Sequence, residues 1–220
     1  MRRKTSWVAG GLLGVTNAKR SLALQLFEPR KWQAPEWIDN RPYCLPANDQ
    51  GREPRCAAYA MACLIEARNW RLTHIPRQID PEPIYRKAKE LDGMPKQDGT
   101  TLEAVVQAAI ELGLLPETTV YKEFKTFDEY CFALHAHGLV LLGFNISDRW
   151  YNCSAKTGWI ASGGTFVGGH AVAGCWYSRI GQVGVGFQNS WGNWGCNGFG
   201  RLILTDYERQ IMGGLAIIVP

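Results

Sequence analysis

The stretch "QNSWGNWGCNGFGRL" (residues 188–202) is the most distinctive part of the sequence. It places tryptophans and glycines around one asparagine, Asn189, which Ser190 and Trp191 follow directly. A short apolar run within residues 182–190 predicts that Asn189 lies at the end of a strand. An asparagine in such a position is most often a turn residue. Its meaning therefore depends on which other side chains the fold brings beside it.

A helix is predicted over residues 56–70, "CAAYAMACLIEARNW", because apolar residues recur at helical spacing among good helix formers. The preceding "NDQGREPR" (48–55) has the composition of a turn. Cys56 is therefore expected at or near a helix N-terminus, where unpaired backbone N–H groups and the helix dipole favour a thiolate over a thiol. A lone cysteine in a helix is usually a packing residue, so this position alone indicates no chemistry.

A histidine completes a set of residue types that suits nucleophilic catalysis. His170 follows "GTFVGG" (164–169) and opens a predicted strand. The order Cys56, His170, Asn189 is that of a thiol nucleophile, its general base and the residue that orients the base. An imidazole accepts the thiol proton, and an amide oxygen fixes the tautomer through the other ring nitrogen without adding charge. The backbone N–H of Cys56 and the side-chain amide of Gln50 would stabilise a developing oxyanion.

The remaining sequence patterns predict an α+β protein. Two further helices are expected, at residues 81–91, which begin with proline, and at residues 100–113, which have a threonine cap and a glycine stop. Short apolar runs separated by glycine-containing turns then predict strands, at residues 138–146, 170–178, 182–190, 199–206 and 213–220. Helices followed by antiparallel strands indicate two segregated layers. No stretch approaches the roughly 20 apolar residues needed to span a bilayer.

Three segments resemble the catalytic segments of papain-like cysteine peptidases, the family of the cathepsins. Residues 48–60, "NDQGREPRCAAYA", resemble the segment around the nucleophile, and residues 168–177, "GGHAVAGCWY", resemble the histidine strand. Residues 188–202 resemble the asparagine segment. Other segments resemble the start of the mature enzyme and the linking helices of compact bacterial and viral members: residues 35–51, 79–93 and 98–117. The resemblance covers about residues 34–210.

The resemblance implies a papain-like two-lobed fold, with a helical lobe, an antiparallel β-barrel-like lobe and an active-site cleft between them. The peptidase domain would span residues 34–220, with lobes at about 50–130 and 135–220. The implied roles are Cys56 as nucleophile, His170 as base, Asn189 as orienting residue, Gln50 as oxyanion donor, Trp191 as the cover over the His–Asn hydrogen bond and Ser190 as a supporting residue. The implied activity is that of a cysteine endopeptidase that needs no cofactor.

The nucleophile segment departs from the family pattern C-G-[SA]-C-[WY]. Glu53 stands where the family has its first cysteine, so the disulfide of that cysteine cannot form. Ala57 replaces an aromatic residue near the cleft. His170 and Asn189 also follow Cys56 at shorter distances along the chain than in the family, which indicates a shortened intervening segment.

The chain contains seven cysteines, an odd number, and no CxxC pair or zinc-binding spacing. This pattern favours a reducing compartment or a catalytic thiol over a disulfide framework. A cytoplasmic or virion-associated protein is therefore favoured over a secreted one. Cys175 and Cys196 are packing thiols or a disulfide, and the sequence leaves both alternatives open. His135 and His137 lack an accompanying carboxylate or thiol cluster, so no metal site is expected.

Residues 1–33 form a basic N-terminal arm, in which Glu28 is the single acid. Because the net charge of the whole chain is +4, the rest of the chain is mildly acidic. Three interpretations of the arm stay open: a signal peptide, a tail packed on its own domain, and an arm that docks on a protein assembly. Nucleic-acid binding is disfavoured, because nothing in the arm reads bases, although its charges suit phosphates.

Two functions from different classes fit these observations. The first is a thiol peptidase that cleaves a peptide or protein substrate through an acyl-enzyme on Cys56. Attack on a cell-wall peptide or an isopeptide bond would use the same residues. The second is a structural or binding component of a larger assembly, for example a phage particle, with a papain-like site that is vestigial or used only during assembly. The basic arm motivates the second function, and the presence of every catalytic-type residue argues against a fully inactive site.

Overall fold

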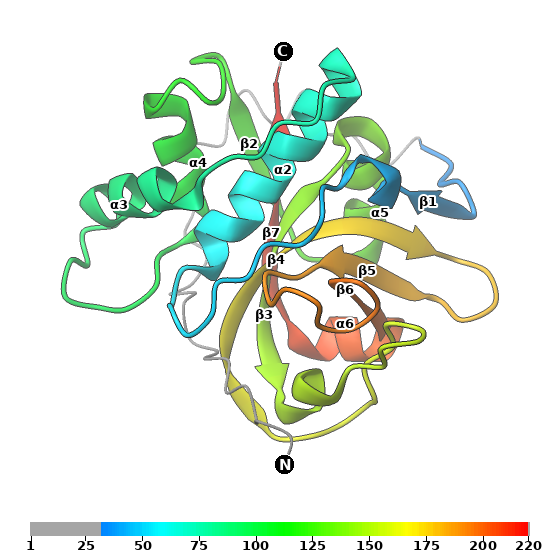
Figure 1. Cartoon of the computed structure of the whole chain (residues 1–220). Helices are drawn as coiled ribbons and strands as arrows, with labels where there is room; N and C mark the ends of the chain where they lie inside the picture. The colour runs from blue at the N-terminus through cyan, green and yellow to red at the C-terminus, as the bar shows by residue number, and fades with distance from the viewer. Residues whose placement is uncertain (1–31, 220) are drawn as a thin grey trace.

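The computed structural model describes residues 32–219, so the predicted arm at residues 1–33 lies almost entirely outside the described residues. The elements are, in chain order, β1 (Trp37–Asp39), η2 (Arg41–Tyr43), α2 (Cys56–Thr73), α3 (Pro81–Leu91), α4 (Leu102–Glu111), β2 (Val120–Phe124), α5 (Phe127–His137), β3 (Val140–Ser147), η3 (Asp148–Asn152), β4 (Phe166–Ser178), β5 (Gly184–Gln188), β6 (Phe199–Ile203), α6 (Leu204–Gln210) and β7 (Ile211–Ile218). The described part of the chain is the α+β fold that the sequence predicts, with most helices ahead of the main strands (Figure 1).

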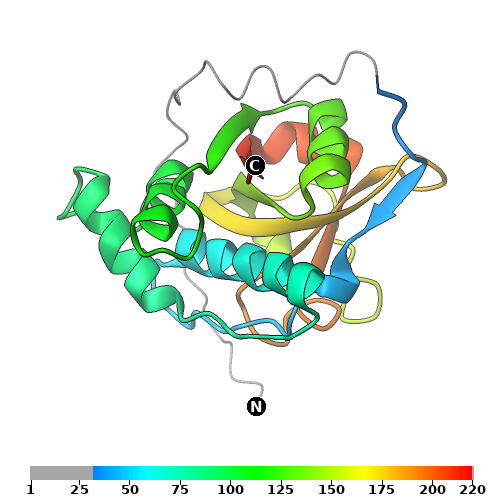
Figure 2. The same ribbon diagram turned by 90° about the horizontal axis from the view of Figure 1, so that it is seen from above.

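Helix α2 lies at the centre of the fold, between α3 and α4 on one side and the sheet on the other (Figure 1). Its residues from Cys56 to Ala67 are all buried except Tyr59, which is half-buried, and many of them are alanines. A helix that is apolar nearly all round is typical of a buried position. Seen from above, α2 runs alongside β4 (Figure 2). It ends before His74, whose left-handed backbone (φ 57°) closes the last turn.

The two helices predicted after α2 are present, and side chains cap both of them. In α3, Pro81 occupies the first turn, and the Asp80 carboxylate accepts a hydrogen bond from the backbone N–H of Glu82 (3.0 Å). In α4, the Thr101 hydroxyl accepts a hydrogen bond from the backbone N–H of Ala104 (3.1 Å). Each cap satisfies a backbone donor that the first turn of a helix leaves unpaired.

The strands within residues 32–219 form one antiparallel sheet in the order β2-β7-β3-β4-β5-β6, and β1 pairs with β4. Strand β4 lies between β3 and β5, and its Ala173 pairs with Gln188 of β5. His170 was predicted to open a strand, but β4 begins four residues earlier, at Phe166, so His170 lies within it; Asn189 directly follows β5. The antiparallel pairing therefore brings these two segments side by side, although the residues are far from adjacent in sequence.

The two faces of the sheet contribute to different hydrophobic cores, as strand β3 illustrates. Leu141 belongs to the core that the sheet forms with Met61 of α2 and with the other early helices. Leu142 and Phe144 point to the opposite face, where they join an aromatic core that includes Trp150. Because β3 is buried on both faces, it has a continuous apolar run in place of an alternating pattern.

The strand predicted at residues 199–206 is wrong at its C-terminal end. Strand β6 ends at Ile203, and helix α6 begins at the next residue. No side chain caps α6, so the local sequence carries no start signal for it. Tyr207 and Gln210 of α6 are buried, and Tyr207 belongs to the aromatic core. Packing against the sheet therefore decides that this apolar run turns into a helix.

Five elements, β1, η2, β2, α5 and η3, have no counterpart among the predicted elements. Helix α5 begins with a capping box, in which the Thr126 hydroxyl accepts from the Glu129 N–H (3.2 Å) and the Glu129 carboxylate accepts from the Thr126 N–H (3.1 Å). This pattern is a sequence signal that could have located the helix. Strand β2 pairs with β7 along its whole length. Between residues 32 and 219, no helix is long and apolar enough to cross a membrane.

Candidate active site

Cys56 is the first residue of α2, as predicted, and its side chain points toward the middle of β4. The Cys56 Sγ accepts a hydrogen bond from the backbone N–H of Ala171 (3.4 Å), the residue after His170. The side chain is buried, with 1% of its surface exposed. The positive end of the helix dipole and this N–H donor both favour negative charge on the sulfur. The position therefore suits a thiol that must lose its proton.

His170 and Asn189 form a buried hydrogen bond between the His170 Nε2 and the Asn189 Oδ1 (2.7 Å). The same oxygen accepts the backbone N–H of Ser190 (2.8 Å), which identifies it as oxygen and sets the orientation of the amide. The His170 Nε2 therefore carries the proton and donates it to this oxygen. The other ring nitrogen, Nδ1, is buried and has no hydrogen-bond partner within residues 32–219. Its lone pair is the basic position of the ring.

Two tryptophans enclose the imidazole of His170. The Trp191 ring lies 4.7 Å from the His170 ring, between centroids, at an interplanar angle of 35°. The Trp150 ring meets it edge-on, at 6.0 Å and 85°. Burial in this aromatic setting lowers the pKa of His170 to about 4, and the hydrogen bond with Asn189 opposes this effect only in part. His170 is therefore a neutral base at pH 7.

Trp150 borders the candidate site, since its ring contacts the His170 ring, and the sequence patterns did not single it out. Its indole N–H donates to the Gln210 Oε1 (2.8 Å), and its ring stacks on Phe187 at 4.8 Å between centroids. Its backbone oxygen accepts the indole N–H of Trp194 (2.7 Å). The latter contact connects Trp194, the second tryptophan of residues 188–202, to the aromatic residues around His170. The sequence around Trp150 has no catalytic signature, so only the tertiary structure reveals this contact.

Gln50 lies in a segment that pairs with the residues after Asn189. Its backbone N–H donates to the Ser190 backbone oxygen (2.9 Å), and the Ser190 hydroxyl donates to the Gln50 Oε1 (2.5 Å). The Gln50 Nε2 donates to the backbone oxygen of Glu53 (2.7 Å). An amide nitrogen has two hydrogens, so this bond uses one and leaves a second donor on Gln50. Ser190 thus connects Gln50 to the asparagine segment.

Two glycines of the asparagine segment are required by close approaches. Gly195 has a positive φ of 59°, and a side chain there would collide with the backbone oxygen of Phe199. A side chain at Gly200 would collide with the ring of Trp194. These glycines let the turn and strand β6 pack tightly around the indole of Trp194. The glycine-rich composition of residues 188–202 is therefore a packing requirement of the aromatic residues around His170.

All seven cysteines are free, including Cys175 and Cys196, so these two residues do not form a disulfide. Hydrogen bonds from the thiols of Cys175 and Cys63 lower the pKa of Cys44, which lies outside the site, to about 5. His137 is partly buried, and burial lowers its pKa. No group of three or more metal-ligating side chains lies close together in the part of the chain that the structure describes.

No model of a known protein family matches the chain, and no curated protein sequence matches it significantly. Its structure is nevertheless similar to solved structures of cysteine proteases. Xylellain, a cysteine protease from Xylella fastidiosa, has a TM-score of 0.78 and 18% identity over 100% of this chain and 98% of that chain. The Amb a 11 cysteine protease, a ragweed pollen allergen, in its proform, has a TM-score of 0.69 and 19% identity over 87% of this chain and 67% of that chain.

A third similar structure is procathepsin B S9 from Trypanosoma congolense, with a TM-score of 0.66 and 15% identity over 97% of this chain and 86% of that chain. The chain therefore has the papain-like fold that its sequence segments predict. Within this fold, Cys56 on helix α2 lies beside strand β4, which contains His170, and Asn189 is hydrogen-bonded to the His170 ring.

Proposed function

We propose that this chain is a thiol peptidase that hydrolyses peptide bonds through an acyl-enzyme on Cys56. The observation that carries the proposal is the 2.7 Å hydrogen bond between His170 Nε2 and Asn189 Oδ1. It leaves the Nδ1 of a neutral imidazole as the proton acceptor, because burial keeps the pKa of His170 at about 4. Cys56 is at the start of α2, and its sulfur accepts a hydrogen bond from the backbone N–H of Ala171, the residue after His170.

In the first half of the reaction, the Cys56 proton moves to His170 Nδ1 while the sulfur attacks the peptide carbonyl. The resulting oxyanion would accept hydrogen bonds from the Cys56 backbone N–H and from the second side-chain N–H of Gln50. The C–N bond then breaks as His170 returns the proton to the departing amine. A thioester between the substrate acyl group and Cys56 remains.

In the second half, a water molecule gives a proton to His170 and attacks the thioester carbon. The C–S bond breaks, the carboxylic acid product leaves, and the thiolate regains its proton from His170. Asn189 acts through His170 in both halves, since it holds the ring in the tautomer that keeps Nδ1 basic. Trp191 also acts through His170, because it excludes water from the His–Asn hydrogen bond.

The test compares hydrolysis of unstructured protein and of a quenched fluorescent peptide mixture by the wild type and by Cys56→Ala. We expect turnover to fall by at least about 10³-fold, because the nucleophile is lost, while the circular dichroism spectrum is unchanged. Cys196→Ala is the matched control. The Cys196 thiol is partly exposed and donates to the Lys156 backbone oxygen (3.7 Å), outside the site, so its loss should leave turnover unchanged.

Equal hydrolysis by Cys56→Ala and the wild type would overturn the proposal. If the wild type hydrolyses neither substrate, and Cys56→Ala is indistinguishable from it, the result favours the alternative function, a component of a larger assembly with a vestigial site.

A further inference from the structure

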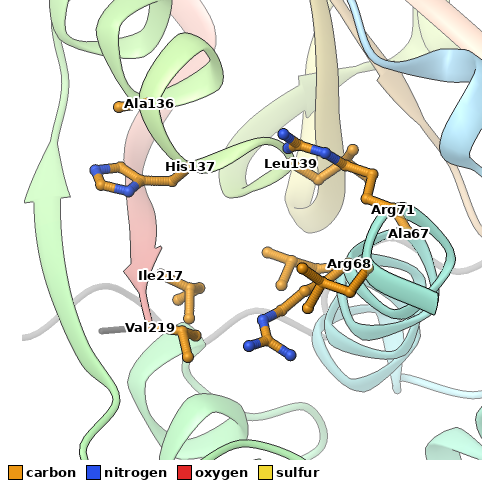
Figure 3. Close-up of a pocket in the computed structure, with 10 residues that line it drawn as sticks. Ala67, Arg68, Arg71, Ala136, His137, Leu139, Ile217 and Val219 are labelled. Atoms are coloured by element: carbon orange, nitrogen blue, oxygen red, sulfur yellow. The ribbon is translucent and has the colours of Figure 1, made fainter.

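A cavity of about 280 Å³ opens at the end of α2 that is remote from Cys56 (Figure 3). One wall comes from α2, and the opposite wall comes from the end of α5, from β7 and from the residue after it. The residues that define these walls are Leu64, Arg68, Arg71, Leu139, Ile217 and Val219. A helix rises by about 1.5 Å per residue, so Arg71 lies roughly 22 Å from Cys56 along the axis of α2. The cavity is thus separate from the candidate active site.

Two arginines give this cavity its charge. Figure 3 shows the side chains of Arg68 and Arg71 extending from α2 toward the opposite wall. Within residues 32–219, neither guanidinium has a carboxylate at salt-bridge distance. The Arg71 guanidinium is held between the Tyr43 ring, at 5.4 Å from its centroid, and Gly138. The cavity therefore has two positive charges that no described side chain neutralises, and one of them is held in place.

The helix dipoles do not cancel this charge. Helices α2 and α5 both end at the cavity, and each C-terminus contributes a partial negative charge of about half an elementary charge. Together they offset about one of the two positive charges. His137, at the end of α5, adds no charge at neutral pH, because burial lowers its pKa. A net positive potential therefore remains at the cavity.

Apart from His137, the other lining residues are apolar, so an inorganic anion would leave most of the cavity unmatched. Leu64 and Leu139 are each 4% exposed, and Ile217 is 5% exposed, so they form a buried floor beneath the two arginines. We propose that the cavity binds a small amphipathic anion, namely a carboxylate on an aliphatic body. The planar guanidinium matches a carboxylate by paired N–H donors. The volume lies near the lower limit of ligand pockets, about 300 Å³, and so selects a small molecule.

The test uses octanoate as the probe, with acetate and octanol as matched compounds that lack the apolar body or the charge. Each is titrated into the ¹⁵N-labelled full chain, and amide shifts are followed by NMR. We expect saturable shifts with octanoate at Ala136, Leu139 and Val219, and at least tenfold weaker binding of acetate and of octanol. The double variant Arg68→Gln, Arg71→Gln should bind octanoate at least tenfold more weakly. Arg77→Gln, outside the cavity lining, should bind it like the wild type.

Octanol that binds as tightly as octanoate would overturn the proposal, because the arginines would then contribute nothing. Acetate that binds as tightly would equally overturn it, since the apolar floor would be irrelevant. So would the absence of saturable shifts, or octanoate shifts centred on His170. Should the double variant lose its fold by circular dichroism, Arg68→Gln alone serves, because Arg68 makes no hydrogen bond within residues 32–219. The readout is binding, so its outcome is independent of the proposed peptidase activity.

Discussion

At its N-terminal end helix α2 has Cys56, and at its C-terminal end it has Arg68 and Arg71. At the N-terminal end, the side chains of the candidate active site are buried, and hydrogen bonds fix the orientation of His170 and Asn189. Asn189 Oδ1 contacts the His170 ring at 2.7 Å and accepts the Ser190 N–H, and Cys56 is 1% exposed. Around the second end, the arginines have no carboxylate partner within residues 32–219, and they border an open cavity.

The difference between the two ends shows what each kind of site requires of the sequence. A buried polar group is costly unless it is hydrogen-bonded, so the first end tolerates few residue types at each position. A partly open cavity with charge at its rim requires only positive charge and apolar walls, and several sequences would provide them. Substitutions near Cys56 should therefore change chemistry, whereas substitutions near Arg71 should change stability or binding.

The largest effect should come from the His–Asn pair. His170→Ala removes the base, so we expect turnover to fall by at least about 10³-fold. Asn189→Ala leaves the base in place and loses only its orientation, so a milder fall of about 10- to 100-fold in kcat is expected. Peptide hydrolysis at pH 7 measures both. Asn193→Ala, an exposed asparagine in the same stretch, should behave like the wild type. An equal fall in turnover in His170→Ala and in the control Asn193→Ala would contradict the assignment of His170 as the base.

The next effect concerns pH and the cover over His170. In the wild type, activity should persist down to about pH 4 and be lost below it, because protonation of His170 removes the base. Trp191→Ala admits water, which stabilises the imidazolium, so the pKa of His170 should rise from about 4 toward its ordinary value of 6.5. The acid limb of kcat/KM should then move to higher pH by at least about one unit.

A parallel NMR titration of the His170 ring checks that the shifted limb belongs to this residue. Trp37→Ala, which removes an indole that is 58% exposed, is the control and should leave the limb unchanged. An unchanged acid limb in Trp191→Ala would show that desolvation by this ring does not control the base.

The smallest effect should come from the other end of α2. Gly138 has φ 88° and ψ −128°, a backbone conformation that residues other than glycine rarely adopt, and an added Cβ would also displace the Arg71 guanidinium. Gly138→Ala should therefore lower the free energy of unfolding by about 1–3 kcal/mol while turnover stays near the wild-type value. Gly93→Ala also has a positive φ, of 69°, but meets open space, so it should cost less in the same urea titration. A larger cost at Gly93 than at Gly138 would contradict the assigned backbone strain at Gly138.

Much of this arrangement could be predicted from the sequence, because several elements have local signals. Helix α2 begins at Cys56 because turn residues precede it, and α4 has its threonine cap where the sequence places one. Helix α6 and the Trp150 wall could not be found in this way, because long-range packing decides both. The residue types and their order predicted the hydrogen bond between His170 and Asn189, and the family resemblance implied the same pair. Its tautomer depends on the Ser190 backbone N–H, which no sequence pattern reveals.

The central claim, that Cys56 is the activated thiol, is tested most directly by reaction with a thiol-directed epoxide, followed by peptide mapping of the modified cysteine. We predict that Cys56 reacts selectively among the seven cysteines and that His170→Ala slows this reaction strongly. Cys44 is the internal comparison, since its pKa is lowered to about 5 and it is partly exposed, but it lies in no catalytic arrangement. Modification of Cys44 in preference to Cys56, or uniform modification of the accessible thiols, would contradict the claim.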